Sequence, residues 1–441
     1  MYLSENKTLR MITLCGLYVA QGVPWGFVTV TFAAWLAQPK HDLTVEQIGP
    51  IMAVATLPWS FKFLWGPLMD RFTIPSMGRR RPWIIFAQSM AVLVLGSMLL
   101  FDDLPSMVWT SAPDSSPAME MIFKLVPGPL AGMILLANIF LSMQDVAVDA
   151  LAVDLLKENE RGVANGMMYG CSYLGTAVGG AGLGWVVSKY GIQAGLMWQA
   201  ILLAGIMLLP LLFRERPSKI HAEHDSHPDS PTPQVSPSVV GDLWKAFHLK
   251  STLLGAGIAL GARIGIGVLT AVFVDYLLKN GWTQQEYTSV MGGYALFLGL
   301  CGSVLGGFAA DRIGAKPIIV VVSLLLGTLW IGCGVYPLVV ESKFLMKCLL
   351  ISQEFLLGVG SVSLFSLFMT ISWPRVAATQ FTTYMALMNL STTCGSYAAG
   401  QLSVHFAVQQ ILVIAGLLQM AMMTPVFFID PGQTRRVLGD A

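Results

Sequence analysis

The amino-acid sequence predicts an all-α membrane protein with twelve transmembrane helices in two six-helix halves and both termini in the cytoplasm. Of the 441 residues, 55% are hydrophobic and only 12% are charged, and the mean hydropathy is +0.66, which differs strongly from a soluble domain. About twelve apolar stretches are long enough to cross roughly 30 Å of hydrocarbon as helices. A charged loop motif also occurs twice, once in each half of the chain.

Composition and charge argue against several other classes. The formal net charge is +1, so nothing indicates a nucleic-acid partner. The six cysteines lie inside apolar stretches and form no Cys-x-x-Cys pair, and we expect them to pack against other side chains rather than bind a metal or form disulfides. We therefore expect a monomer in the lipid bilayer that acts on a small molecule, with no metal and no cofactor.

The apolar runs define the predicted helices in order. The first helix follows the short polar segment Met1–Arg10, which has no small-residue cleavage site, so we expect this helix to be retained. Each later helix occupies an apolar run of membrane-spanning length. The predicted cores are 11–37, 47–68, 83–101, 129–153, 163–188, 192–213, 252–278, 287–309, 317–340, 345–371, 377–402 and 406–429.

Three polar regions interrupt these helices. Residues 102–128 carry acidic residues and prolines and are too polar to span the membrane. Residues 214–250 are rich in proline, serine and histidine, which is typical of a linker. The tail from Asp430 is short. The predicted domains are therefore an N-terminal six-helix bundle at 1–213, a cytoplasmic linker at 214–250, and a C-terminal six-helix bundle with a short tail at 251–441.

Basic residues give these helices an orientation. With the N-terminus inside, most of the 26 lysines and arginines fall in cytoplasmic loops, including the run Arg79–Arg81. The residues that face outward are Lys40, Lys124, Lys189, Lys279, Lys343 and Lys347. This positive-inside bias predicts that the termini and the linker are cytoplasmic.

The repeated charged loop follows the second predicted helix of each half. Its first copy is Gly66-Pro67-Leu68-Met69-Asp70-Arg71, and its second copy, from Gly307 to Lys316, contains Asp311-Arg312. An aspartate and an arginine at a helix end can pair with helix termini of a neighbouring bundle. We therefore predict a cytoplasmic gate formed by Asp70, Arg71, Asp311 and Arg312. The alternative, for Arg80 and Arg81 above all, is that the arginines only set the topology.

Charged side chains within membrane helices are costly and usually functional. Lys62 in the second helix and Asp145 in the fourth lie at similar depths, so the two side chains can meet. We expect Lys62 to bind the substrate and Asp145 to carry or gate a proton. The alternative is a fixed ion pair that only orders the N-terminal half.

The fourth helix carries polar residues along one face. Asn138, Ser142, Asp145 and Asp149 follow one another at spacings of four, three and four residues, so they should point into a common cavity. We expect Asn138 to contact the substrate. Asp149 lies nearer the cytoplasm, and we expect it to join the gate as the partner of Arg71 or of the run Arg79–Arg81.

The C-terminal half contributes Arg263 in the seventh helix and Glu354 in the tenth, both near the membrane midplane where transporter sites are expected. A guanidinium can bind a carboxylate or phosphate with two parallel hydrogen bonds, so we expect Arg263 to anchor an anionic substrate. Burial disfavours the charged form of a carboxyl group, so Glu354 can hold a coupling proton. The alternative is that the two residues neutralise each other.

The first helix presents Tyr18, Gln21 and Trp25 on one face. Such amide and aromatic surfaces pack against sugar rings, so these residues are candidate substrate contacts, although ordinary helix packing is the alternative. Gly22 and Pro24 predict a local break in this helix. Glycine pairs such as Gly175 and Gly179 predict close helix packing.

Other classes of function find less support. The fifth helix lacks the Gly-Pro step that resembles the antiporter signature of drug exporters, which favours uptake. His221, His224 and His227 lie in the linker, where solvation explains them better than a metal site. A membrane enzyme would need a nucleophile or a His–Asp pair at a membrane face, and the spacing from His224 to Asp229 also falls in the linker. A transporter-shaped sensor that binds without translocating is a further alternative.

The duplicated loop resembles the signature of the major facilitator superfamily of secondary transporters. Within it, the chain is similar to the AmpG-type muropeptide permeases over essentially the whole transporter core. The resemblance rests on the runs from Phe61 to Phe72, from Gly78 to Trp83 and from Ser142 to Ala150, and on Glu160-Arg161-Gly162, Glu354 and Ala378-Thr379-Gln380-Phe381.

The resemblance implies proton-driven import of an anhydromuropeptide across a bacterial inner membrane by alternating access, with Lys62, Asp145, Asp149 and Glu354 at charged family positions. The chain departs from the family in the seventh helix, where Arg263-Ile264-Gly265-Ile266 lacks the acid of the family's Lys-x-Gly-Asp. Related branches of the superfamily handle siderophores and acetyl-coenzyme A, and these remain alternative substrate classes. In each case the proton gradient would supply the energy.

Overall fold

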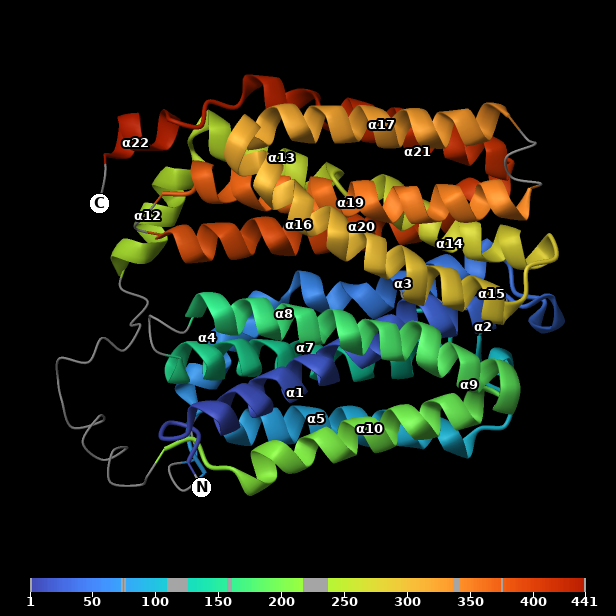
Figure 1. The fold of residues 1–441 in the computed structure, drawn as a ribbon, viewed down its shortest axis with the longest axis horizontal. Coiled ribbons are helices and arrows are strands. Elements are labelled where there is room, and N and C mark those ends of the chain that lie inside the picture. The colour runs from blue at the N-terminus through green and yellow to red at the C-terminus, as the bar shows by residue number, and fades with distance from the viewer. Residues whose placement is uncertain are drawn as a thin grey trace, which may run out of the picture. The chain divides into compact units, whose positions relative to one another are not determined.

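The computed structural model describes residues 2–72, 74, 77–108, 126–156, 161–216, 237–336, 342–373 and 376–439. Every regular element within these ranges is a helix, and the isolated β-bridges join Tyr2 to Arg214 and Ile74 to Gly78 (Figure 1). The prediction of an all-helical fold is therefore confirmed. The chain forms two compact units, one from Met1–Leu36 with Phe61–Thr232 and the other from Ala37–Ser60 with Pro233–Ala441.

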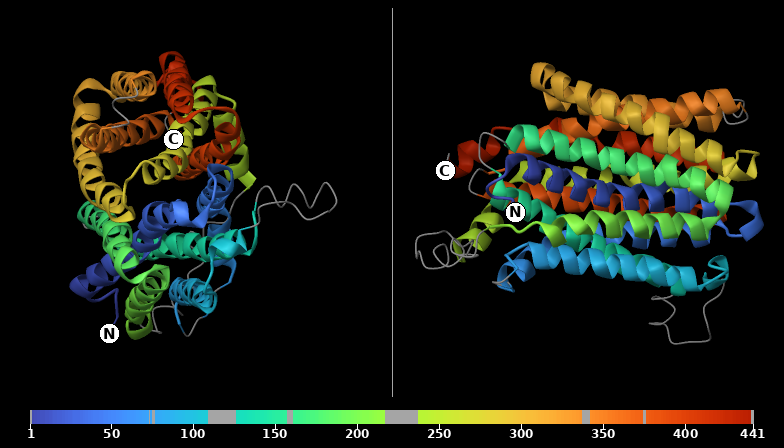
Figure 2. Two further views of the ribbon diagram at one scale, coloured as in Figure 1. Left: turned by 90° about the vertical axis from the view of Figure 1, so that its right-hand side faces the viewer. Right: turned by 60° about the horizontal axis from the view of Figure 1, so that its bottom comes forward.

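The first unit is built from long helices that pack side by side, and Figure 2 shows them nearly end-on in its left view. α1 packs against α8 and α7, and α5 lies between α7 and α10. Its elements are α1 (Lys7–Gly26), η1 (Phe27–Phe32), α2 (Ala33–Leu36), η3 (Lys62–Leu64), α4 (Trp65–Arg71), α5 (Arg81–Ser97), η4 (Met98–Leu100), η5 (Pro105–Met107), α7 (Pro129–Leu155), α8 (Arg161–Ala177), η7 (Val178–Gly182), α9 (Leu183–Tyr190) and α10 (Ile192–Leu212).

The second unit contains the remaining helices. α20 packs against α3, α13 and α14, and α19 packs against α16 and α17. Its elements are η2 (Pro39–His41), α3 (Val45–Ser60), α12 (Pro237–Phe247), α13 (Lys250–Gly261), α14 (Ile264–Lys279), α15 (Gln284–Ser289), η8 (Val290–Ala295), α16 (Leu296–Ile313), α17 (Ala315–Val335), α19 (Lys343–Ile371), α20 (Ala377–His405), α21 (Val408–Met422), η10 (Thr424–Phe428) and α22 (Gln433–Leu438).

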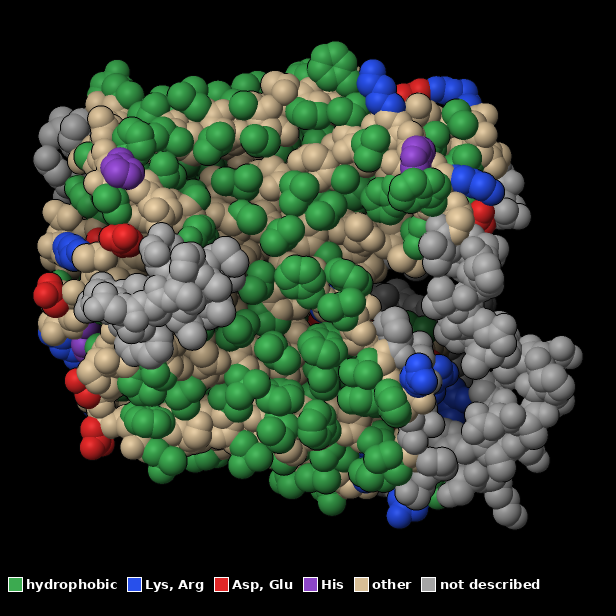
Figure 3. Space-filling view, turned by 180° about the vertical axis from the view of Figure 1, so that it is seen from behind, with side chains coloured by type: hydrophobic (Ala, Val, Ile, Leu, Met, Phe, Trp, Pro, Cys, Tyr) green, Lys and Arg blue, Asp and Glu red, His purple; other side chains and the backbone are tan. Residues whose placement is uncertain are grey.

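In the described part of the chain, nine helices are long and apolar enough to cross a membrane. The other predicted spans are helical too, but α3 is short, α8 is rich in glycine and α20 is rich in serine and threonine. Hydrophobic side chains cover most of the face seen in Figure 3, as contact with lipid requires. The exact number of crossings and the side on which the termini lie stay predictions.

Close packing of α1 on α8 and η7 fixes the core of the first unit. A Cβ atom on Gly175 would lie 2.4 Å from the carbonyl oxygen of Val19, and one on Gly179 would lie 2.0 Å from that of Val23. The helix backbones therefore touch, which confirms the packing role predicted for this glycine pair.

Two of the predicted helices, with cores at 47–68 and 252–278, contain a break that the sequence pattern did not predict. The first break is at Phe61, three residues after Pro58, which has no N–H for the preceding turn and crowds it. The second break is at Arg263, whose backbone N–H donates to the Ser391 hydroxyl at 3.0 Å. A side chain from another helix thus replaces the intrahelical acceptor.

The prediction of a break at Gly22 and Pro24 is wrong. α1 continues through both residues to Gly26, and the irregular π-helical segment Phe27–Phe32 comes after it. Gly22 instead lets α8 approach, because a Cβ there would lie 2.1 Å from the Ser172 carbonyl oxygen. The glycine serves helix packing rather than exposure of the backbone.

Candidate functional site

A charged cluster lies inside the first unit. Lys62, on the short turn η3 after the break in the second predicted helix, places its Nζ 3.2 Å from Oδ2 of Asp145 on α7. The Lys62 side chain is 22% exposed and the Asp145 side chain 12% exposed, so the ion pair is mostly buried but still partly accessible. The structure thus brings together two residues that the sequence placed at similar depth.

The face of α7 contributes further polar groups to this cluster. Trp65, one turn after Lys62, donates its indole N–H to the Ser142 hydroxyl at 3.0 Å. Asn138 lies apart from the cluster, because its amide donates to the Ile134 carbonyl in its own helix and it lines a small, mostly apolar cavity with Gln199. Its expected contact with substrate is therefore not part of the charged cluster.

Asp149 has a different partner from the one expected. Its Oδ1 accepts a hydrogen bond of 2.5 Å from the Tyr18 hydroxyl on α1. The edge of the Tyr169 ring meets Tyr18 with the ring centroids 6.1 Å apart, and Tyr169 is 62% exposed. Asp149 was expected to pair with Arg71 or with the run Arg79–Arg81, but its hydrogen-bond partner is Tyr18. It lies one helical turn from Asp145 and near two tyrosines.

The two other candidates on α1 differ in their surroundings. Gln21 is buried, and its Nε2 has no hydrogen-bond partner among the described residues. Trp25 is half-buried. Gln21 therefore has a donor ready for a ligand or a water molecule.

The arginine run at the start of α5 is held by acids that sequence reasoning missed. The Glu215 carboxylate accepts the backbone N–H groups of Arg79 and Arg80 at 2.9 and 2.7 Å, and that of Arg81 as well. Arg80 forms an ion pair of 2.9 Å with Asp154. These contacts anchor the loop before α5 within its own unit.

The predicted gate residues lie at helix ends. Arg71 ends α4, is exposed, and lies over the Phe72 ring at 6.0 Å. Arg312 is exposed in the last turn of α16. The side chains of Asp70 and Asp311 lie outside the described residues, as do His221, His224 and His227 of the linker, so the gate stays a prediction.

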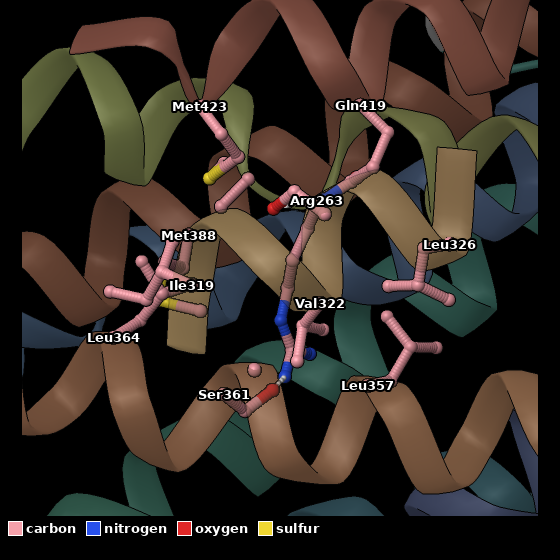
Figure 4. Close-up of a pocket in the computed structure, with 13 residues that line it drawn as sticks. Arg263, Ile319, Val322, Leu326, Leu357, Ser361, Leu364, Met388, Gln419 and Met423 are labelled. Carbon is pink, nitrogen blue, oxygen red and sulfur yellow. Dashed lines mark hydrogen bonds between the residues drawn. The ribbon is translucent and has the colours of Figure 1, made fainter. Parts of the chain in front are cut away.

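In the second unit, Arg263 occupies the break between α13 and α14. Its guanidinium Nη2 donates to the Ser361 hydroxyl of α19 at 3.1 Å, and the side chain lies along a cavity of about 30 Å³ that Gln419 also lines (Figure 4). This volume is enough for water beside the guanidinium.

Glu354 lies on α19 beside a buried hydrogen bond. The Trp330 indole donates to Gln353 at 2.8 Å, and the Gln353 amide in turn approaches Glu354 at 3.5 Å. Arg263 is within electrostatic range of Glu354. The alternative that the two residues neutralise each other stays a prediction.

No group of three or more His, Cys, Asp or Glu side chains suited to a metal ion occurs in the described ranges. The first unit instead contains the Lys62–Asp145 ion pair and the hydroxyls of Tyr18 and Tyr169 near Asp149, and the second unit contains Arg263 near Glu354.

The sequence model of the Major Facilitator Superfamily matches residues 14–389, which is most of the chain. This chain belongs to the major facilitator superfamily. Membership establishes a multi-pass membrane transporter of small molecules, a permease rather than an enzyme.

Two relatives illustrate the branch. The anhydromuropeptide permease of Escherichia coli strain K12 is 24% identical over 389 residues, covering 88% of this chain and 72% of that protein. An uncharacterized protein of Haemophilus influenzae is 23% identical over 399 residues, covering 88% of this chain and 86% of its own length. The predicted similarity to muropeptide permeases is therefore confirmed at the level of sequence.

Solved structures of other superfamily members share the fold. A single-residue mutant of the nucleoside transporter NupG has a TM-score of 0.70 at 13% identity, with 95% of this chain and 99% of that chain covered. The inward-open xylose transporter XylE from E. coli has a TM-score of 0.67 at 13% identity, with 95% and 96% covered. At this identity the likeness shows the major facilitator fold.

Sequence reasoning about this transporter found the charges but missed their neighbours. Trp65 stands in the motif that carries the family likeness, three residues after Lys62, and this spacing could have indicated a shared face. Tyr169, Glu215 and Ser361 gave no signal, because their roles depend on which helices pack together.

Proposed function

We propose that this transporter imports a polar, anionic solute by proton symport and alternating access in a bacterial inner membrane, with an anhydromuropeptide as the first candidate. The observation that carries the proposal is the reachable Lys62–Asp145 ion pair with aromatic side chains around it. A charged side chain within a membrane helix costs free energy, and such residues usually have a function. The identity to the E. coli anhydromuropeptide permease supports the substrate class.

The proposed roles are shared between residues of the two units. Lys62 and Arg263 would attract the anion, with Tyr18, Gln21, Trp25 and Asn138 as further substrate contacts. Asp145 and Glu354 would handle the proton, and Asp70, Arg71, Asp311 and Arg312 would gate the cytoplasmic side. The proton gradient would supply the energy without a bound cofactor, and a monomer would suffice.

A proteoliposome uptake assay tests the proposal. Purified protein is reconstituted, a pH gradient is imposed, and labelled anhydromuropeptide, a siderophore and an acyl-coenzyme A are offered separately. We expect concentrative uptake of the muropeptide that collapses when an ionophore removes the gradient. Uptake of another substrate in its place would overturn the substrate class, and uptake that ignores the gradient would overturn symport.

The variant Glu354→Gln separates binding from coupling. A neutral amide cannot take up and release the proton, so accumulation against a gradient should be abolished, whereas exchange of labelled for unlabelled substrate should continue. Counterflow measured in the same vesicles supplies the exchange rate. Concentrative transport in this variant at the rate of the unsubstituted protein would reject the proton role of Glu354.

A further inference from the structure

The charged cluster of the first unit contains one cation and two acids. Lys62 pairs with Asp145 at 3.2 Å, whereas Asp149 accepts a hydrogen bond from the Tyr18 hydroxyl at 2.5 Å. Among the described residues, Asp149 has no basic side chain within 4 Å as an ion-pair partner. The single lysine therefore forms an ion pair with one carboxylate only. The second carboxylate lies within electrostatic range of Lys62 without pairing with it, and it accepts a hydrogen bond from a neutral hydroxyl.

The charge balance assigns different tasks to the two acids. An ionised carboxylate away from water is costly unless a cation compensates it. Protonation of Asp145 would break the 3.2 Å ion pair with Lys62, whereas protonation of Asp149 would leave that pair intact and remove the carboxylate charge that has no paired cation. Of the two acids, Asp149 is thus the one whose protonation the cluster favours.

The other elements that pack against α7 bring no further cation to Asp149 within the described residues. α1 contributes Tyr18, η3 contributes Lys62, and Tyr169 of α8 lies in electrostatic range. Arg81 starts α5, and its guanidinium donates to the carbonyl groups of Pro210 and Leu211. The remaining charged groups lie at the ends of these elements. Lys7 and Arg10 are in the first turn of α1, with the Arg10 guanidinium donating to the Leu3 carbonyl, and Asp154 at the end of α7 pairs with Arg80. Arg71 is exposed on α4, and the side chains of Asp70 and Arg161 are outside the described residues.

We propose that Asp149 carries the coupling proton and that Tyr18 is the positioning residue that holds its carboxylate in the ionised form. One proton adds to an Asp149 oxygen from the external side and leaves to the cytoplasmic side, and no covalent bond of the protein changes otherwise. Asp145 then serves as the counter-ion of Lys62. This inference rests on the proton symport proposed above and moves Asp149 and Tyr18 from the gate and substrate roles expected from the sequence.

Infrared difference spectroscopy during a pH titration tests the inference without any substrate. Lowering the pH should produce the C=O stretch of protonated carboxylic acids. The component that belongs to Asp149 should be lost in Asp149→Asn and retained in Glu354→Gln, whereas any component from Glu354 should behave in the opposite way. In Asp145→Asn the Asp149 component should appear only at lower pH, because Lys62 is then free to balance Asp149. A band that persists unchanged in Asp149→Asn would overturn the proposal.

Tyr18→Phe tests the positioning role. Loss of the hydrogen bond to the charged form should let Asp149 keep its proton to a higher pH, so the midpoint of the infrared titration should move upward. A purely structural tyrosine would lower thermal stability without moving this titration. An unmoved midpoint would overturn the role of Tyr18, even if Asp149→Asn failed to fold.

Transport measured in parallel separates this inference from the proposed function. Asp149→Asn should lose accumulation driven by the pH gradient and keep counterflow. If the unsubstituted protein accumulates no solute under a pH gradient, the proposed symport fails, whatever the infrared band does. If it accumulates solute and Asp149→Asn does so equally well, symport stands and the role of Asp149 fails.

Discussion

At the scale of the residue, both cations deep in the predicted membrane helices stand at helix breaks. Lys62 begins the turn η3, and Arg263 separates α13 from α14. A break leaves backbone groups free to bind side chains or water, which lowers the cost of a charge at membrane depth. The Arg263 backbone uses Ser391 in this way, and its guanidinium uses Ser361. The location of both charged side chains therefore depends on the helix breaks as well as on their positions in the sequence.

The ion pair of Lys62 and Asp145 can be functional or only structural, and a pair of variants decides. Lys62→Met leaves a mostly buried carboxylate without its partner, which should cost about 2 kcal/mol, below the range for fully buried pairs because both side chains are partly exposed. The double variant Lys62→Met with Asp145→Leu should regain thermal stability but not uptake. Recovery of uptake in the double variant would establish the purely structural role.

Glu215 should stabilise the loop before α5, because it accepts three successive backbone N–H groups. Glu215→Ala removes these acceptors and should lower the melting temperature and speed trypsin cleavage at the run Arg79–Arg81, with Glu215→Gln intermediate. Glu5→Ala is the matched control, since Glu5 is exposed and near the same end of the unit. Equal cleavage rates in the Glu215 and Glu5 variants would refute the anchoring role.

At the scale of the element, periodic and compositional signals predicted where helices run, and they could not predict where helices bend. α7 covers 129–155 against an expected core of 129–153, because an unbroken apolar run determines it. The break at Phe61 follows Pro58, a signal that the sequence itself contains. The break at Arg263 and the π segment after α1 depend on contacts with other helices, from Ser391 and Gly179 respectively. The partner of Asp149 was missed for the same reason, since Tyr18 reaches it only once α1 packs on α7.

Glycine packing along α8 offers a test within one helix. Gly175→Ala would push a methyl group to 2.4 Å from the Val19 carbonyl oxygen and should destabilise the protein by roughly 1 to 3 kcal/mol. Gly170 on the same helix has open space around it, so Gly170→Ala should be neutral or slightly stabilising. Thermal unfolding in detergent measures both, and equal midpoints would contradict the packing described here.

At the scale of the whole molecule, the orientation in the membrane is predicted from the sequence and does not follow from the helical fold alone. Superfamily membership establishes a multi-pass transporter, but orientation in the membrane rests on the distribution of lysine and arginine. The basic run Arg79–Arg81 lies at the same end of its unit as the N-terminal segment, since Glu215 binds the run through its side chain and Ser4 through its backbone. The arginine run and the N-terminus must therefore face the same compartment, and the positive-inside rule predicts that this compartment is the cytoplasm.

Cysteine accessibility measures this orientation directly. In a variant without the native cysteines, Lys40→Cys and Lys189→Cys should react with a membrane-impermeant maleimide in intact cells, because both positions are predicted to face outward. Glu5→Cys and Arg435→Cys should react only after permeabilisation. Labelling of Glu5→Cys in intact cells would contradict the predicted topology, because it would place the N-terminus outside. The arginine run lies at the same end of the first unit and would then face outward too, and the predicted direction of proton-driven transport would be reversed.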